Sequence, residues 1–234
     1  MSKIYTVIAA GGLGKRLQDY GNNKKTKMLL EINGQSMIVK QLNQLISWDL
    51  DNFIVITNPK YDKLIKDELS KNMPDLKIEY SLQDQQLGVA HALLQAENLV
   101  PSDAKILYIL GDNFFEFNPL IDFDISKSKA SIFLTQVSNP EEFGVIEIVE
   151  DKIKSIQEKP LNPRSDYIAV GLYLFDNLCF EYIKSIQKSD RGEYEITSLI
   201  EKYLDNNDLN FQFTSGWWID AGTPEAIETI EKLL

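Results

Sequence analysis

The chain has 234 residues, of which 44% are hydrophobic and 25% are charged, so it can bury a sizeable core as one domain. Its formal net charge of −11 excludes a general nucleic-acid-binding surface, which needs a basic face. A single cysteine excludes an internal disulfide, and the lack of a long apolar run or a signal-peptide pattern predicts a cytoplasmic protein without a membrane span.

A short apolar run at 4–10 predicts a buried strand, and a glycine-rich stretch, AAGGLGKRL at 9–17, follows at its end. Small residues after a strand let backbone N–H groups approach a phosphate chain. Residues 15–27 then hold five cations against one acid, Asp19, so a locally basic site can exist on this acidic protein. We predict a phosphate-binding loop here, with a plain tight turn as the alternative.

This loop matches neither of the two familiar phosphate-binding motifs. The dinucleotide fingerprint needs a third glycine where Leu17 stands. The Walker A motif needs a glycine where Ala9 stands and a hydroxyl where Arg16 stands. Arg16 instead offers a planar set of donors to phosphate oxygens, which favours a different phosphate chemistry.

The rest of the first half alternates helical and strand patterns. Helices are predicted at 35–47, 60–69 and 88–99, and strands at 53–57, 76–82 and 104–110. This alternation predicts a parallel, doubly wound sheet with right-handed crossovers.

The pattern changes after residue 128, where short apolar runs follow one another. Strands are predicted at 130–137, 144–150, 152–159, 168–175 and 209–215, and helices at about 176–186, 194–205 and 224–233. The expected fold class is α/β, a Rossmann-like doubly wound mixed sheet with a β-rich elaboration. We predict a single domain over 1–234, with a nucleotide-binding half at about 1–125 and a second half at about 126–234.

Two acidic residues stand where strands are predicted to end. Asp112 follows the predicted strand at 104–110, and Asp220 follows an apolar pair in WWIDAGTPEA. Ligands gather at the carboxyl edge of open α/β sheets, and Mg²⁺ is often held between one or two carboxylates and substrate phosphates. Together with the basic glycine loop, these carboxylates predict a Mg²⁺ site, although sequence spacing leaves open whether the two side chains meet.

Nine segments occur together in an order that resembles the sugar-phosphate nucleotidyltransferase family, most closely its thymidylyltransferase branch. In chain order they are AAGGLGKRL, KTKMLLEINGQSMI, QDQQLGVAHAL, LGDNFFE, FGVIEI, QEKP, YIAVGLYLFD, GEYEITSL and WWIDAGTPEAI. The resemblance covers residues 4 to about 230, and the ordered set is far more specific than any one segment. It implies the nucleotide-diphospho-sugar transferase type of fold, with the β-rich half binding the sugar.

The resemblance also implies a role for individual residues. Those implied to bind the nucleotide are Ala10, Gly11, Gly12 and Gly14 at the phosphates, and Gln83 and Gly88 at the pyrimidine. Those implied to bind the sugar are Asn113, Gly144, Glu158, Ala169 and Val170, with Lys159 at its phosphate. The implied catalytic residues are Arg16, which stabilises the departing pyrophosphate, with Lys27, Asp112 and Lys159. Asp112 and Asp220 are the implied Mg²⁺ ligands.

The implied reaction joins a nucleoside triphosphate, dTTP or UTP, to a sugar-1-phosphate, giving a nucleotide sugar and pyrophosphate. The implied partners are the nucleoside triphosphate and the sugar-1-phosphate. Neither nucleic acid nor membrane is an expected partner, and the sequence leaves open whether the chain forms a homo-oligomer. An alternative is a short relative that uses CTP and another phosphorylated acceptor such as phosphocholine, with Trp217 and Trp218 facing the quaternary amine. A regulator that binds nucleotide sugars without turnover is a third reading, and the retained charged residues count against it.

Several residues depart from the family's usual pattern. Lys15 stands where Thr is common, Thr26 and Glu31 replace prolines, and His91 takes the place of a Gln. As a lone histidine in a predicted helix, His91 is interpreted as structural. Base and sugar identity are therefore the least secure implications of the resemblance.

Overall fold

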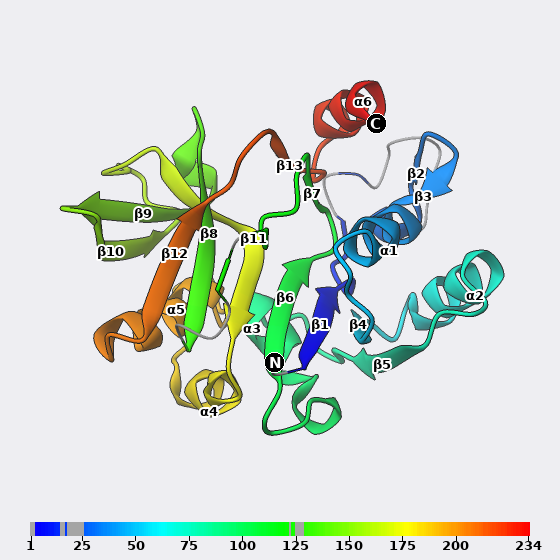
Figure 1. Cartoon of the computed structure of the whole chain (residues 1–234), viewed down its shortest axis with the longest axis horizontal. Coiled ribbons are helices and arrows are strands. Elements are labelled where there is room, and N and C mark those ends of the chain that lie inside the picture. Colours follow the sequence, from blue (N-terminus) through cyan, green and yellow to red (C-terminus); the bar gives the residue numbers. More distant parts are fainter. Residues whose placement is uncertain (1–2, 15–16, 18–25, 122, 125–128) are drawn as a thin grey trace.

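The computed structural model describes residues 3–14, 17, 26–121, 123–124 and 129–234. Within these ranges, one mixed sheet runs through the molecule (Figure 1). Its main path is β10 (Lys152–Glu158), β9 (Gly144–Val149), β11 (Tyr167–Phe175), β6 (Lys105–Leu110), β1 (Ile4–Ala9), β4 (Phe53–Thr57) and β5 (Ile78–Leu82). β8 (Ala130–Gln136) pairs with β11 and with β12 (Leu209–Phe213).

The sheet changes character between β6 and β11. β1 pairs in parallel with β4 and β6, and β4 pairs in parallel with β5, as the alternation of predicted strands and helices requires. β11 is antiparallel to β6, β8 and β9. The predicted doubly wound mixed sheet with a β-rich elaboration is confirmed, and β11 is the strand that joins its two parts.

Helices cover both faces of the sheet, and the strands alternate between two buried clusters. α1 (Met37–Ile46), α2 (Asp62–Asn72) and α6 (Pro224–Leu233) pack on one face, and α3 (Val89–Leu94), α4 (Leu178–Ser185) and α5 (Ile196–Asp205) on the other. In β1, Ile8 belongs to the first cluster and Val7 to the second, and both are fully buried. Because both faces are covered, the central strands read as continuous apolar runs rather than as alternating ones.

Two predicted helices are shorter than their sequence pattern suggests. The helix predicted from residue 35 begins at Met37, because Gln35–Ser36 forms strand β3 and pairs with β2 (Glu31–Ile32). The helix predicted at 88–99 ends at Leu94 and is followed by the 3₁₀ turn η4 (Glu97–Leu99). At the end of α3 the hydroxyl of Ser81 donates a 2.7 Å hydrogen bond to the carbonyl of Gln95. This bond gives a partner to a carbonyl at the end of the helix.

Besides β2 and β3, two further short strands were not predicted. β7 (Asn113–Phe115) follows β6, and β13 (Trp218–Asp220) pairs with it antiparallel from far along the chain. Figure 1 shows this pair above the end of β6, next to α6. Among the described helices, none has the length and apolar character needed to cross a bilayer.

Candidate active site

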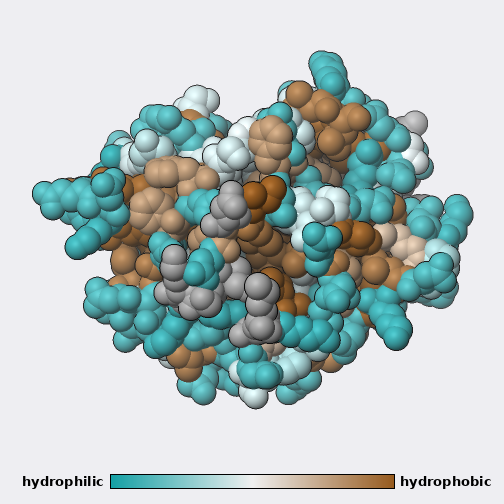
Figure 2. Space-filling view, viewed as in Figure 1, coloured by the Kyte–Doolittle hydropathy of each residue, from teal (hydrophilic) through white to brown (hydrophobic). Residues whose placement is uncertain are grey.

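Two adjoining cavities open where β1 and β6 end. The small cavity, about 230 Å³, is lined by Ala9, Gly11, Gly12, Lys27, Gln83, Gln86, Gly88, Val89, Ala92, Tyr108, Leu110, Asp112 and Glu193. The large cavity, about 410 Å³, is lined by residues of β7, β10, β11, β13 and the start of α5, together with Val89 and Leu110. These last two apolar residues belong to both walls. Figure 2, in the orientation of Figure 1, shows apolar residues over the middle of the molecule with hydrophilic residues on either side.

The glycine loop after β1 lies against the neighbouring strand ends. A Cβ on Gly11 would lie 3.2 Å from the carbonyl oxygen of Thr57, so the backbone approaches β4 closely. The buried Asn58 donates a 2.7 Å side-chain hydrogen bond to the carbonyl of Gly11. This hydrogen bond anchors the Gly11 carbonyl, and with it the backbone of the loop where it lines the small cavity.

Gln83 and Gly88 also line the small cavity, with the Gln83 side chain next to Gly11. The Gln83 side-chain nitrogen donates to the carbonyl of Gly88 at 3.1 Å, and its backbone N–H donates to Thr57 at 2.8 Å. Gly88 has φ +105° and precedes α3, where Tyr194 bridges the turn by donating to the Leu87 carbonyl and accepting from the Ala90 N–H. The turn at Gly88 is therefore fixed by a loop from the second half of the chain.

Replacing Gly88 by Ala is expected to destabilise the fold by about 1–3 kcal/mol. A Cβ at Gly88 would lie 2.6 Å from the Tyr194 carbonyl oxygen, in a backbone region that L residues rarely adopt. The matched control is Gly34→Ala, since Gly34 has φ +77° with nothing within 4 Å of the added Cβ. Urea unfolding of both variants separates the clash from the backbone strain; equal losses would contradict the close contact.

Lys27 and Asp112 form an ion pair on the floor of the small cavity. Lys27 begins the 3₁₀ turn η3 (Lys27–Leu29), and its stem packs against Gly14, where a Cβ would lie 3.0 Å from the Lys27 Cβ. The ammonium of Lys27 contacts the carboxylate of Asp112. Burial alone would raise the pKa of Asp112, but the charge and hydrogen bond of Lys27 outweigh burial and hold that pKa below its usual value.

The pairing of β7 with β13 brings Asp112, which directly precedes β7, close to Asp220 at the end of β13. Asp220 is the register partner of Asn113, and the N–H of Ala221 donates a 2.7 Å hydrogen bond to the carbonyl of Asp112. Asp112 lines the small cavity and Asp220 lines the large one. The two acids that sequence spacing could not connect therefore lie on adjacent backbones beside the boundary of the cavities.

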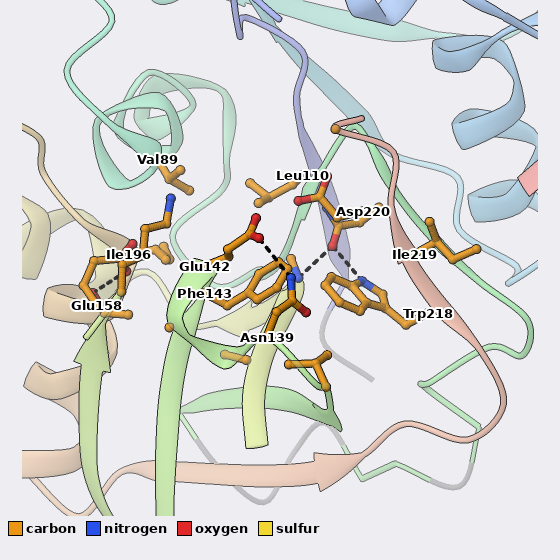
Figure 3. A pocket seen from close by; sticks show the side chains of 18 of the residues that line it. Val89, Leu110, Asn139, Glu142, Phe143, Glu158, Ile196, Trp218, Ile219 and Asp220 are labelled. Carbon is orange, nitrogen blue, oxygen red and sulfur yellow. Dashed lines mark hydrogen bonds between the residues drawn. The ribbon is translucent and has the colours of Figure 1, made fainter. Parts of the chain in front are cut away.

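Asn113 lines the large cavity and connects three strands there. Its side-chain oxygen accepts from the N–H of Gly171 at 2.9 Å and from the indole N–H of Trp218 at 2.7 Å. Its side-chain nitrogen donates to Asp112 at 3.2 Å. Trp218 also packs edge-on against Phe143, with ring centroids 5.6 Å apart, and Figure 3 shows both rings beside Asp220.

Glu158 lies at the far side of the large cavity, at the end of β10 (Figure 3). Its carboxylate accepts from the Thr197 hydroxyl at 3.0 Å and pairs with Arg191 at 3.3 Å. Burial and the neighbouring charge of Glu195 raise the pKa of Glu158, although Thr197 and Arg191 oppose the rise. The next residue, Lys159, has φ +42°, and it also lines the cavity.

Replacing Glu158 by Gln is expected to change how stability depends on pH. Folding raises the pKa of Glu158, so this group favours folding fully only below the ordinary glutamate pKa of about 4.3. The wild type loses this contribution as the pH rises from there through the folded-state pKa of Glu158. The E158Q variant lacks this loss, so its unfolding temperature relative to wild type should be higher at pH 7.5 than at pH 4. A pH-independent difference between the two proteins would contradict the buried charge.

Most residues singled out from the sequence line one of the two cavities. Gly11, Gly12, Lys27, Gln83, Gly88 and Asp112 line the small cavity, and Asn113, Gly144, Glu158, Lys159, Ala169 and Asp220 line the large one. Three do not line either cavity: Ala10 and Val170 are fully buried in the core, and Gly14 packs on Lys27. Arg16 and Lys15 lie outside the described residues.

Sequence reasoning missed Asn58, Thr197 and Arg191. Asn58 follows β4 at the same sheet edge where Asp112 follows β6, so the signal used for Asp112 would have found it. Thr197 lies within the GEYEITSL segment, but its contact with Glu158, like that of Arg191, depends on the packing of α5 and its preceding loop on β10.

The chain is similar to known proteins over most of its length. The family model described as "Nucleotidyl transferase" matches residues 5–234. A glucose-1-phosphate thymidylyltransferase from Neisseria meningitidis serogroup A is 34% identical, and the match covers 94% of this chain and 79% of that protein. One from Mycobacterium tuberculosis is 32% identical, and the match covers 94% of this chain and 78% of that protein.

Solved structures are also similar. A crystal structure from Bacillus anthracis, assigned as a glucose-1-phosphate thymidylyltransferase in complex with a sucrose, is 35% identical with a TM-score of 0.88. It covers 98% of this chain and 94% of its own. A UDP-glucose pyrophosphorylase complexed with UDP-glucose is 19% identical with a TM-score of 0.84, covers 100% and 98% of the two chains, and shares the fold.

Proposed function

The chain belongs to the nucleotidyl transferase family, and we propose that it transfers a nucleotidyl group from dTTP or UTP to a sugar-1-phosphate. It is a nucleotidyltransferase of nucleotide-sugar biosynthesis, similar to the glucose-1-phosphate thymidylyltransferases. The observation that carries the proposal is the pair of adjoining cavities, with Asp112 in the wall of one and Asp220 in the wall of the other. We assign the triphosphate to the small cavity and the sugar-1-phosphate to the large one.

The proposed reaction is a single displacement at phosphorus. An oxygen of the sugar phosphate forms a bond to the α-phosphorus, the bond from that phosphorus to the bridging oxygen breaks, and pyrophosphate leaves with the electron pair. The attacking phosphate is already an anion, so no strong general base is required. The main task is to hold two anions in line against their repulsion, which is achieved by positioning and electrostatic stabilisation.

The cations of the site suit this task. Lys27 lines the small cavity, Lys159 lines the large one, and Arg191 pairs with Glu158 beside it. We propose that Lys27 contacts the triphosphate and Lys159 the sugar phosphate. By resemblance we also propose that Arg16 stabilises the departing pyrophosphate and that Gly11, Gly12 and Gly14 cradle the phosphates.

The acidic residues fit a Mg²⁺ ion that also needs substrate oxygens. Among the described residues, no group of three or more His, Cys, Asp or Glu side chains could hold a metal by itself. Two carboxylates on adjacent backbone segments, Asp112 before β7 and Asp220 in β13, suit Mg²⁺, which usually takes one or two carboxylates and completes its shell with phosphates and water. When bound, the ion would neutralise charge on the transferring group.

For the sugar, we propose that Glu158 and the backbone at Gly144 and Ala169 contact hydroxyl groups. The side-chain oxygen of Asn113 accepts hydrogen bonds from Gly171 and Trp218, and its nitrogen donates one to Asp112. These bonds within the protein support a role in shaping the pocket. Ala10 and Val170 are proposed to act through the backbone or through packing, since both are fully buried.

The test is pyrophosphate release from a panel of substrates. The full chain is incubated with Mg²⁺, one of dTTP, UTP, CTP, ATP or GTP, and glucose-1-phosphate, another sugar-1-phosphate or phosphocholine, with EDTA in place of Mg²⁺ as the control. Release with dTTP or UTP and a sugar-1-phosphate, abolished by EDTA, is the expected result. Release only with CTP and phosphocholine would favour the alternative acceptor, and no release with any pair would contradict both.

A further inference from the structure

We propose that His91 is a positioning residue for base selection, which orients the Gln83 amide so that the small cavity accepts uracil or thymine and rejects cytosine. The inference rests on the proposed function only in assigning the base to the small cavity. His91 is not among the residues that line the small cavity, and it contacts Gln83 through a hydrogen bond to the amide nitrogen.

The orientation of the Gln83 amide follows from its partners. One end of the amide lies 3.1 Å from the carbonyl oxygen of Gly88, which can only accept a hydrogen bond. That end must therefore be the nitrogen, because the opposite orientation would bring two oxygen acceptors together. The carbonyl of Gly88 thus accounts for one of the two hydrogens on this nitrogen, and the second needs its own acceptor to hold the amide in place.

His91 occupies the second hydrogen of the same nitrogen. Its ring nitrogen Nδ1 lies 3.2 Å from the Gln83 nitrogen. Since that nitrogen is a donor and its contact is the shorter of the two that amide nitrogens make with the ring, we infer that Nδ1 carries the lone pair and that the proton of the neutral ring sits on Nε2. Burial and the positive charge of Lys188 lower the pKa of His91, against a hydrogen bond to the Gln85 backbone, so the ring is neutral at pH 7.

The imidazole is itself held in place. It lies against the ring of Tyr194 at 6.2 Å between centroids and 22° between planes. The side-chain nitrogen of Gln95 donates to the backbone carbonyl of His91 at 2.9 Å, which anchors the residue through its backbone. Tyr194 belongs to the loop that bridges the turn at Gly88, so the same loop holds both groups that orient Gln83.

With both amide hydrogens used, only the oxygen of Gln83 is left for a ligand. Among the described residues, no donor reaches this oxygen, and it faces Gly11, where a Cβ would lie 3.4 Å away. Uracil and thymine carry a ring N3–H that can donate to it. Cytosine presents a bare N3 acceptor at the same position, which would oppose two lone pairs and leave a buried oxygen unpaired.

The experiment compares His91→Asn with His91→Leu. The Oδ1 of Asn can replace Nδ1 as the acceptor, whereas Leu has similar bulk and no acceptor. Affinities for dTTP and CTP are measured by calorimetry on the full chain, and kcat and KM are measured for each triphosphate with Mg²⁺ and glucose-1-phosphate.

Wild type is expected to bind dTTP more tightly than CTP, and H91N to stay within about threefold of it. H91L should lose about tenfold in dTTP affinity and about tenfold in the dTTP-to-CTP ratio, with kcat nearly unchanged. An unchanged ratio in H91L, equal losses in both variants, or a wild type that prefers CTP would overturn the inference. Absence of turnover with intact dTTP selectivity would instead count against the proposed function alone.

Discussion

Replacing Asp112 by Asn is expected to reduce pyrophosphate-forming turnover on the order of 10³-fold while the fold stays intact. The carboxylate lies beside the ammonium of Lys27 and next to the strand that carries Asp220, where the proposed Mg²⁺ ion would bind. An Asn side chain keeps the shape and an oxygen that can accept from Asn113, and the backbone carbonyl still accepts from Ala221. The charge is removed, and the Lys27 ammonium, whose side chain is 19% exposed and lines the cavity, can be hydrated there, so the loss should fall mainly on catalysis.

The measurements are kcat for pyrophosphate release with dTTP, Mg²⁺ and glucose-1-phosphate, and the unfolding temperature of each protein. The matched control is Asp208→Asn, because Asp208 pairs with Lys129 in an exposed ion pair away from both cavities. That variant should keep wild-type turnover and lose less than about 1 kcal/mol of stability. Near-normal turnover in D112N would remove Asp112 from the proposed metal site.

Replacing Lys27 by Met is expected to affect both activity and stability. It removes a cation from the proposed triphosphate site, and kcat/KM should fall about 100-fold or more. It also leaves the carboxylate of Asp112, a residue only 7% exposed, without the ammonium that holds its pKa down. Leaving one member of a buried ion pair unpartnered costs about 3 kcal/mol of folding free energy.

A double-mutant cycle separates these two effects. Urea unfolding of wild type, K27M, D112N and K27M/D112N gives the coupling energy between the two side chains. The double variant should be more stable than K27M, because the unpartnered charge is gone, while its turnover stays as low as that of D112N. Additive stability losses would show that the ion pair does not stabilise the fold as we infer.

The parts of the fold that the sequence predicts are those with long local patterns. β1, β4 and β6 are apolar on both faces because helices cover both, and their alternation with helices indicated the parallel sheet. The short strands β7 and β13 have three residues each, too few to show a period of two. Their pairing depends on contacts between residues 105 positions apart, such as that of Trp218 with Asn113.

The candidate site divides in the same way. Residues that follow strands, such as Gly11 and Asp112, could be found because the carboxyl edge of a parallel sheet is where ligands gather. Residues that act through another side chain could not, and His91 is the example: its helix position indicates a structural residue, and only the hydrogen bond to Gln83 shows what it faces. Arg191 and Thr197 likewise become visible only once α5 is packed against β10.

The shared wall of the two cavities has a consequence for how such a protein can diversify. Val89 and Leu110 are the common residues, and neither carries a polar side chain that would make the contents of one cavity depend on the other. Under the proposed assignment, substitutions at Phe143 should alter the choice of acceptor without altering the choice of nucleoside triphosphate. Glu158 differs, because Arg191 pairs both with it and with Glu193 of the small cavity. A change of acceptor alone is therefore expected to begin at Phe143 rather than at Glu158.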